Sequence, residues 1–311
     1  YYEFSNSLDG GGYLQYKVHH LLQIIFWAYL CCMAIKVSSY NEKISFFSYV
    51  KKMNLDFLVI LGVYFMLIAL SGDRGPIIYT SILFFAGYFV SQGKKLNFKK
   101  MFILVCLGAI SLQFLGYFRE TDGLMSFSDR IDHALIVKND IQSRGDGSLF
   151  PPSIELAQSL RAYHAVIMDQ EVNPILFGLG NLGALLAIIP GLGVVIQSVS
   201  SYSFTNSAIY ITDIMGADHG MGTTALADIY LNYGFWGVLV LFSFFGYFFA
   251  KLDKTSYENF KINSIFMQVS FLVFISYAIY IGRATFIGVF SDIVMVWVFV
   301  KLASLFYRLK R

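Results

Sequence analysis

Long apolar runs, separated by short polar connections and one long polar segment, set the pattern of this chain. A run of about 20 apolar residues, rising about 1.5 Å each, crosses the hydrocarbon of a bilayer as a helix. Seven runs qualify, at residues 18–37, 55–70, 76–90, 101–118, 225–250, 265–281 and 284–302. The pattern therefore predicts an all-α polytopic membrane protein with about seven transmembrane helices in this sequence.

The long polar segment divides the chain into three expected parts. They are four transmembrane helices in 1–118, a large extracytoplasmic loop in 119–223, and three further helices with a basic cytoplasmic tail in 224–311. The chain opens on Tyr1 without a methionine or a signal peptide, so we expect further helices upstream.

Two segments of the large loop have an apolar pattern of their own. Residues 153–169 have helical spacing. The residues expected on one face of that helix are Leu156, Leu160, Tyr163 and Ile167. Residues 175–199 are apolar enough to span but are rich in glycine and contain Pro190. A crossing there would move the basic C-terminus outside, so we expect a re-entrant or interfacial hairpin broken near Pro190.

Composition supports a membrane protein. Apolar residues make up 57% of the chain and charged residues only 14%, against about 25% charged in soluble domains. The net charge of +3 is not arranged as a basic stripe, which argues against nucleic-acid binding. Cys31, Cys32 and Cys106 all lie in apolar runs, without the spacing of a disulfide framework or a metal site.

Lysine and arginine divide between the two sides of the membrane. Connections after the first, third and fifth spans, with the C-terminus, carry the larger and mostly lysine set, which predicts a cytoplasmic side. The set expected outside is mostly arginine: Lys17, Arg74, Arg119, Arg130, Lys138, Arg144, Arg161 and Arg283. A guanidinium binds phosphate oxygens with two parallel hydrogen bonds, so outer arginines indicate an anionic ligand.

Three of these arginines lie at helix ends. Arg74 lies in a tight Gly-rich turn, directly before Gly75 and Pro76, where a helix can begin. Arg119 ends the fourth span, and Arg283 lies in a short outer turn. Together they are candidates for one anion site, although each alone also fits an interfacial anchor.

Histidines and carboxylates supply the candidate acid–base groups. His219, just before the fifth span, is a candidate general base, or a polar loop residue. His19 and His20, at the start of the first span, fit interfacial anchoring better. A metal site at Asp129, Asp132 and His133 has only weak support, so no metal and no cofactor are expected.

Two acids fall in or near lipid. Asp228 lies near the outer end of the fifth span, one turn above Asn232, and Asp292 lies near the middle of the seventh. Such carboxylates should face the bundle interior and be paired or protonated, serving either a proton pathway or a bond between helices.

The chain resembles bacterial O-antigen polysaccharide polymerases of the Wzy type, which are related to the O-antigen ligases. The resemblance rests on Ser71–Gly75, on Leu176-Phe177-Gly178 followed by Ile188-Ile189-Pro190, and on Leu226 through Gly234-Phe235-Trp236-Gly237. It implies a GT-C-like membrane glycosyltransferase that moves a glycan from undecaprenyl pyrophosphate onto a sugar hydroxyl of another lipid-linked repeat unit.

The resemblance also implies roles for residues. Arg74 would bind the pyrophosphate with Arg119 and Arg283 in support, and His219 would be the base. In the ligases the histidine lies closer to the following helix than His219 does, which keeps Asp228 in reserve. Lipid-linked oligosaccharides are the expected partners, with a chain-length regulator as a further one, in the bacterial inner membrane.

Three other functions remain open from the sequence. An O-antigen ligase uses the same donor with a different acceptor. A lipid-linked oligosaccharide flippase or other transporter would place its site at the midplane, where Asp292 is suited, but would have short external loops. A non-catalytic assembly subunit would tolerate loss of the arginines and of His219.

Overall fold

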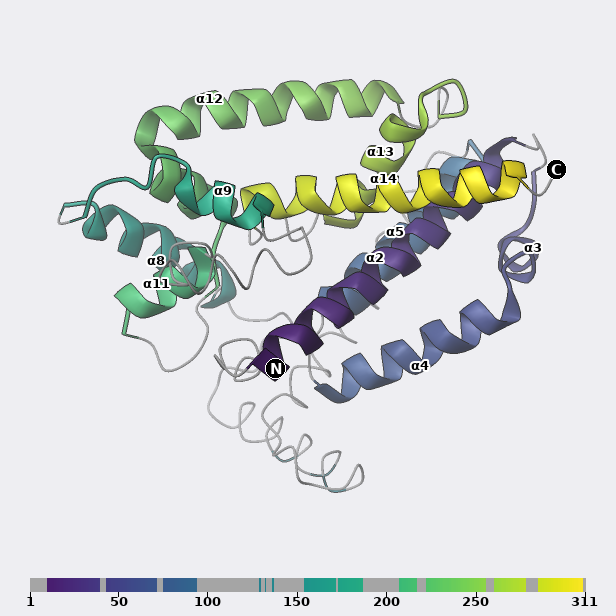
Figure 1. Cartoon of the computed structure of the whole chain (residues 1–311), viewed down its shortest axis with the longest axis horizontal. Helices are drawn as coiled ribbons and strands as arrows, with labels where there is room; N and C mark the ends of the chain where they lie inside the picture. Colours follow the sequence, from purple (N-terminus) through teal and green to yellow (C-terminus); the bar gives the residue numbers. More distant parts are fainter. Residues whose placement is uncertain are drawn as a thin grey trace.

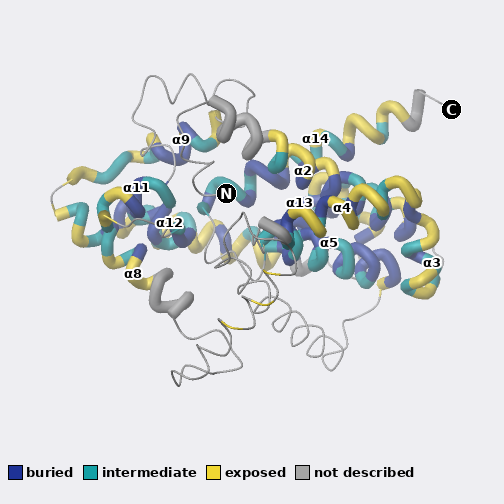
Figure 2. Tube along the Cα trace, turned by 90° about the horizontal axis from the view of Figure 1, so that it is seen from below, coloured by how far each residue is buried: buried dark blue, intermediate teal, exposed yellow. Residues whose placement is uncertain are grey.

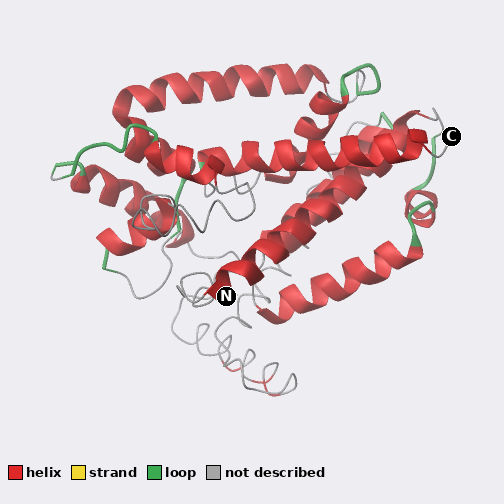
Figure 3. Cartoon of the chain, in the orientation of Figure 1, coloured by secondary structure: helices red, strands yellow, loops and turns green. Residues whose placement is uncertain are grey.

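The structure, a computed structural model, describes residues 10–39, 43–71, 75–93, 129, 132, 136, 154–171, 173–186, 207–216, 222–255, 260–277 and 285–309. Within these residues every regular element is a helix (Figure 3), as the apolar pattern predicts. The helices are α2 (Gly10–Ser39), α3 (Phe46–Lys51), α4 (Leu55–Ser71), α5 (Gly75–Ser91), α8 (Ile154–Asp169), α9 (Leu179–Leu186), α11 (Ser207–Ile214), α12 (Ala225–Thr255), α13 (Ile265–Tyr277) and α14 (Phe286–Leu309).

Six of the seven expected spans coincide with helices, and the span expected at 101–118 lies outside the described residues. Three helices are long and apolar enough to cross a membrane, at Val18–Ser39, Ala225–Leu252 and Phe286–Phe306. The others, α4, α5 and α13, are shorter apolar helices.

Four helices form the core, since α2 packs on α5, α5 on α13, α13 on α14, and α14 on α2 (Figure 1). Their shared interior is apolar, and its side chains are both aliphatic and aromatic. Trp27 is fully buried there, and its indole N–H donates to Thr80 Oγ1 at 2.9 Å, which satisfies the polar group of a large apolar side chain. Rings of α12, α13 and α14 pack in edge-to-face and tilted pairs, in one cluster of Phe245, Phe248, Phe274, Phe286 and Phe290.

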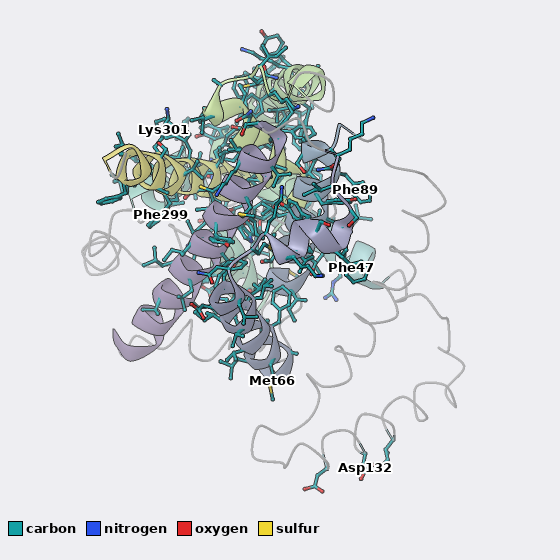
Figure 4. All side chains as sticks on the ribbon, turned by 90° about the vertical axis from the view of Figure 1, so that its right-hand side faces the viewer. Phe47, Met66, Phe89, Asp132, Phe299 and Lys301 are labelled. Atoms are coloured by element: carbon teal, nitrogen blue, oxygen red, sulfur yellow. The ribbon has the colours of Figure 1, made fainter. Side chains whose placement is uncertain are left out.

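The outer surface of the bundle is also apolar. Figure 2 shows exposed faces along α4 and α14, and α12 carries large exposed side chains such as Trp236, which is 75% exposed. Met66 of α4 lies at the edge of the bundle and is 64% exposed (Figure 4). Apolar side chains of this size at a helix surface are suited to contact with lipid.

The helices have two distinct ends. In Figure 1, α3 and the C-terminal ends of α12 and α14 lie at one end, and α8, α9 and α11 gather near the start of α12 and α14 at the other. The first of these ends, called here the lysine end, carries Lys36, Lys51, Lys251 and Lys301. The opposite end is called the polar end, and the loop helices lie there.

α12 is broken into two helices at Gly234, whose φ of 63° and ψ of −162° are not helical. A side chain is strongly disfavoured in that conformation, which glycine tolerates. The break frees the carbonyls of Leu231 and Asn232 from helical bonding. They accept hydrogen bonds from the backbone N–H groups of Leu176 (3.1 Å) and Gly178 (3.0 Å) instead. The break therefore joins the loop to the bundle.

Candidate functional site

Two clusters of buried and partly buried polar side chains lie at the polar end of the bundle. The first, the Asp228 cluster, consists of Asp228, Asn232 and the N-terminus of α14. The second, the His20 cluster, consists of His20, Tyr277 and Asp292. Each cluster joins helices that are far apart in the sequence.

Asp228 is only 3% exposed, one turn into α12. Its Oδ2 accepts a hydrogen bond of 2.9 Å from the backbone N–H of Phe286, the first residue of α14. Asn232 Nδ2 donates to the backbone oxygen of Asp228 at 2.9 Å and lies 3.5 Å from its Oδ1. A carboxylate at a helix N-terminus satisfies an N–H that has no partner in its own helix and interacts favourably with the helix dipole. The expectation that Asp228 faces the interior and is paired is confirmed.

Two of the motifs that carry the family resemblance meet beside this cluster. Gly178 of the loop motif has φ +82°, and a Cβ there would lie 2.9 Å from the ring of Tyr233. A Cβ on Gly237 would lie 2.1 Å from Cβ of Tyr233. The glycines of both motifs thus make room for one tyrosine, directly before the break at Gly234. This gives the loose Gly-x-x-Gly pattern a steric reason.

Asp292 lies within α14 and is 5% exposed. Its Oδ1 is 3.0 Å from Nε2 of His20 on α2, and its Oδ2 accepts a hydrogen bond from the hydroxyl of Tyr277 on α13. The ring of Tyr277 packs against Tyr79 of α5, with centroids 4.7 Å apart. The expectation that Asp292 is buried and paired is confirmed, and the cluster joins all four core helices.

The two adjacent histidines of α2 do not lie as expected. His20 binds Asp292, and His19 Nε2 lies 3.1 Å from the hydroxyl of Tyr64 on α4, with their rings stacked at 5.4 Å. α2 begins at Gly10, so both histidines lie inside the helix rather than capping it. Both rings bind neighbouring helices, which the expectation of interfacial anchoring did not include. The sequence feature that could have indicated such contacts between helices is a histidine and two carboxylates within apolar runs.

Helices α8 and α11 cover the first half of α12. The hydroxyl of Tyr210 donates to Asp169 at 2.5 Å. Burial, together with this hydrogen bond and the nearby carboxylate, raises the pKa of Tyr210 well above its ordinary value. The helix expected at 153–169 is confirmed as α8. Leu160 is 64% exposed, and the buried face is centred on Ala162 and Val166.

Most of the site residues expected from the sequence lie outside the described residues: Arg74, Arg119, Arg283 and His219, as do Pro190 and His133. Asp228 is described and has the bonds given above. Asp132 lies away from the helical bundle (Figure 4). Within the described part of the chain, no group of three or more His, Cys, Asp or Glu residues is placed to hold a metal ion.

Comparison with known proteins gives one match. The model of the family described as O-antigen polysaccharide polymerase Wzy matches residues 12–309. No curated protein and no solved structure matches the chain. The family match covers nearly the whole sequence and includes both polar clusters. The chain belongs to the O-antigen polysaccharide polymerase Wzy family.

Proposed function

We propose that this protein transfers a glycan from undecaprenyl pyrophosphate to a sugar hydroxyl of another lipid-linked repeat unit, on the extracytoplasmic face of the inner membrane. Family membership gives the activity of an O-antigen polysaccharide polymerase, a glycosyltransferase-type reaction, in a multi-pass bacterial membrane protein. It favours this function over a ligase or a transporter. The distribution of lysines supports a cytoplasmic C-terminus and an extracytoplasmic loop at 119–223.

The chemistry explains the need for cations. The bond between the anomeric carbon and the diphosphate oxygen breaks, and its electron pair leaves with the diphosphate. The acceptor oxygen bonds to the same carbon and loses its proton to a base. We propose that Arg74, Arg119 and Arg283 bind the departing diphosphate, without a metal ion, because guanidinium groups stabilise phosphate charge as it develops.

One contact carries the site proposal, the 2.9 Å hydrogen bond from Phe286 N–H to Asp228 Oδ2. It brings the start of α14, three residues after Arg283, to the start of α12, which follows the segment with His219. Arg283 lies in the connection between α13 and α14. At the α13 end of this connection, Tyr277 packs on Tyr79, which lies about one turn after the residue that follows Arg74. These contacts support one common site at the polar end.

The acceptor proton needs a receiving group on the same side. The sequence offers His219 and Asp228 for this role. The bond of Asp228 to the N-terminus of α14 favours an anchoring role for that carboxylate. We further propose a chain-length regulator as a protein partner of the polymerase.

The test is polymerisation of a purified lipid-linked repeat unit by the reconstituted protein, with products separated by length on a gel. We expect Arg74→Ala to slow chain growth about 100-fold, as for loss of one donor to developing charge. Arg74→Lys should keep part of the rate, because a point charge replaces the two-bond contact.

Arg161→Ala is the matched control, since Arg161 is an exposed arginine of α8. It should polymerise normally. In cells, Arg74→Ala should lose long chains while single repeat units still reach the surface, whereas a flippase variant would show no surface glycan. Unchanged chain growth in Arg74→Ala would contradict the assignment of the arginine.

A further inference from the structure

We propose that His20 takes the proton from the acceptor hydroxyl and that Asp292 and Tyr277 are positioning residues that hold its ring for this step. The inference rests on the proposed polymerase reaction and names its proton acceptor from residues that the structure describes. The proposed roles of the arginines and the proposed glycan donor stay unchanged.

The bond to Asp292 decides which nitrogen of the ring carries the proton. Because a carboxylate only accepts, the 3.0 Å contact requires the proton on Nε2 of His20. Nδ1 of a neutral imidazole then carries the lone pair, which is the form needed in a general base. When the ring takes up a second proton, the adjacent carboxylate stabilises the imidazolium.

Tyr277 completes the arrangement. Its hydroxyl donates to Oδ2 of Asp292, so each carboxylate oxygen has its own partner and the carboxylate cannot rotate without losing one. The side chain of Asp292 is 7% exposed, whereas that of His20 is 27% exposed. The carboxylate that orients the ring is therefore buried, whereas the imidazole reaches the surface of the bundle. This is the arrangement expected of a general base and the residue that positions it.

The position of the cluster suits a lipid-linked substrate. His20 is the third residue of the candidate span Val18–Ser39, near its N-terminal end. Tyr277 ends α13, and its neighbour Tyr79 lies in the first turns of α5, so the cluster is at the polar end. Among the described residues, α13, α5 and α14 bring Tyr277, Tyr79 and Asp292 to the His20 cluster.

A structural role would be served by a simpler contact, and α2 contains one. His19, the preceding residue, binds a neutral partner, the hydroxyl of Tyr64, and stacks on its ring. It joins α2 to α4 without a buried carboxylate. The charge of Asp292 is costly at this position, and a link between helices does not require it.

The experiment measures turnover of the reconstituted protein with the lipid-linked repeat unit, and wild-type chain growth establishes the polymerase reaction itself. We expect His20→Ala to lower kcat about 100-fold or more with little change in KM, as for loss of a general base. Added imidazole should restore part of that rate. His19→Gln, the matched control, should keep the wild-type kcat.

Asp292→Asn tests the positioning role and preserves shape if His20→Ala does not fold. Its kcat should fall about 10-fold or more, because the amide no longer fixes the proton on Nε2, and imidazole should not restore it. Folding of each variant is followed by its melting temperature. Wild-type kcat in His20→Ala would overturn the proposal. So would imidazole rescue of His219→Ala without rescue of His20→Ala. Absence of polymerisation by the wild-type protein would instead refute the proposed function.

Discussion

Replacing Asp228 by alanine tests whether this carboxylate anchors α14 or performs chemistry. The substitution removes the acceptor of the Phe286 N–H, which the structure places 2.9 Å away in a buried position. A buried donor left without a partner costs about 1–3 kcal/mol. Loss of the negative charge at the N-terminus of α14 adds about 0.3–1 kcal/mol. Asn232 keeps its bond to the backbone oxygen, and relief of the buried charge offsets part of the loss.

The expected net effect of Asp228→Ala is a loss of about 2 kcal/mol in the free energy of unfolding. Asp228→Asn should cost about 1 kcal/mol or less, because an amide oxygen still accepts from the N–H. The assay is unfolding of the purified protein in mixed micelles with increasing SDS. Asp213→Ala, which removes an exposed carboxylate from α11, should leave stability unchanged.

Polymerisation measured on the same samples separates the two roles. An anchor predicts that activity falls with stability and that Asp228→Asn keeps most of both. If Asp228→Ala has wild-type stability but no polymerase activity, the carboxylate takes part in the reaction and the anchoring argument is wrong.

Three further substitutions, one of them a control, test the packing of the helices. Gly237→Ala should destabilise the protein by at least about 2 kcal/mol, because its Cβ would lie 2.1 Å from Cβ of Tyr233. Gly246→Ala, on the same helix with nothing within 4 Å, should be neutral or stabilising by about 0.5–1 kcal/mol. Thr80→Val should cost about 1–3 kcal/mol, since it leaves the fully buried indole N–H of Trp27 without its acceptor. Unfolding in SDS measures the stability of all three variants. Equal stability of the two glycine variants would contradict the steric explanation for the glycine next to the break in α12.

The apolar pattern predicted the helices because length and hydropathy are local properties of the chain. The predicted helix boundaries agree less closely with the structure. α2 begins at Gly10, eight residues before its expected start, since polar residues near a helix end do not interrupt it. Which face of α8 is buried was not predicted from the apolar spacing, since Ala162 and Val166 are buried and Leu160 is exposed.

The polar clusters were predictable only in part. The cost of a carboxylate in lipid indicated that Asp228 and Asp292 would be buried and paired. Their partners were not predictable, because His20 and Asp292 lie 272 positions apart and Phe286 contributes a backbone N–H that no side-chain pattern reveals. The break at Gly234 was equally hidden, since a glycine pair in an apolar run also fits close helix packing.

The distribution of polar and aromatic contacts has a consequence for function. The phenylalanines of α12, α13 and α14 pack without directional bonds. Near the polar end, hydrogen bonds with fixed geometry hold the ends of the same helices. Packing of apolar rings would have been less costly there too, because a buried ion must be desolvated before it is paired.

Directional bonds provide what apolar packing does not, a fixed position for each helix end. The diphosphate and the acceptor hydroxyl must meet within a fraction of an ångström of the reacting geometry, and a misplacement of about 1 Å costs about 100-fold in rate. Asp228 holds α14 to α12, and Asp292 holds α2 and α13 to α14. Each carboxylate thereby fixes one end of the connection between α13 and α14. The polar end therefore has the fixed helix positions that the proposed site requires, and these bonds explain why buried carboxylates are found there.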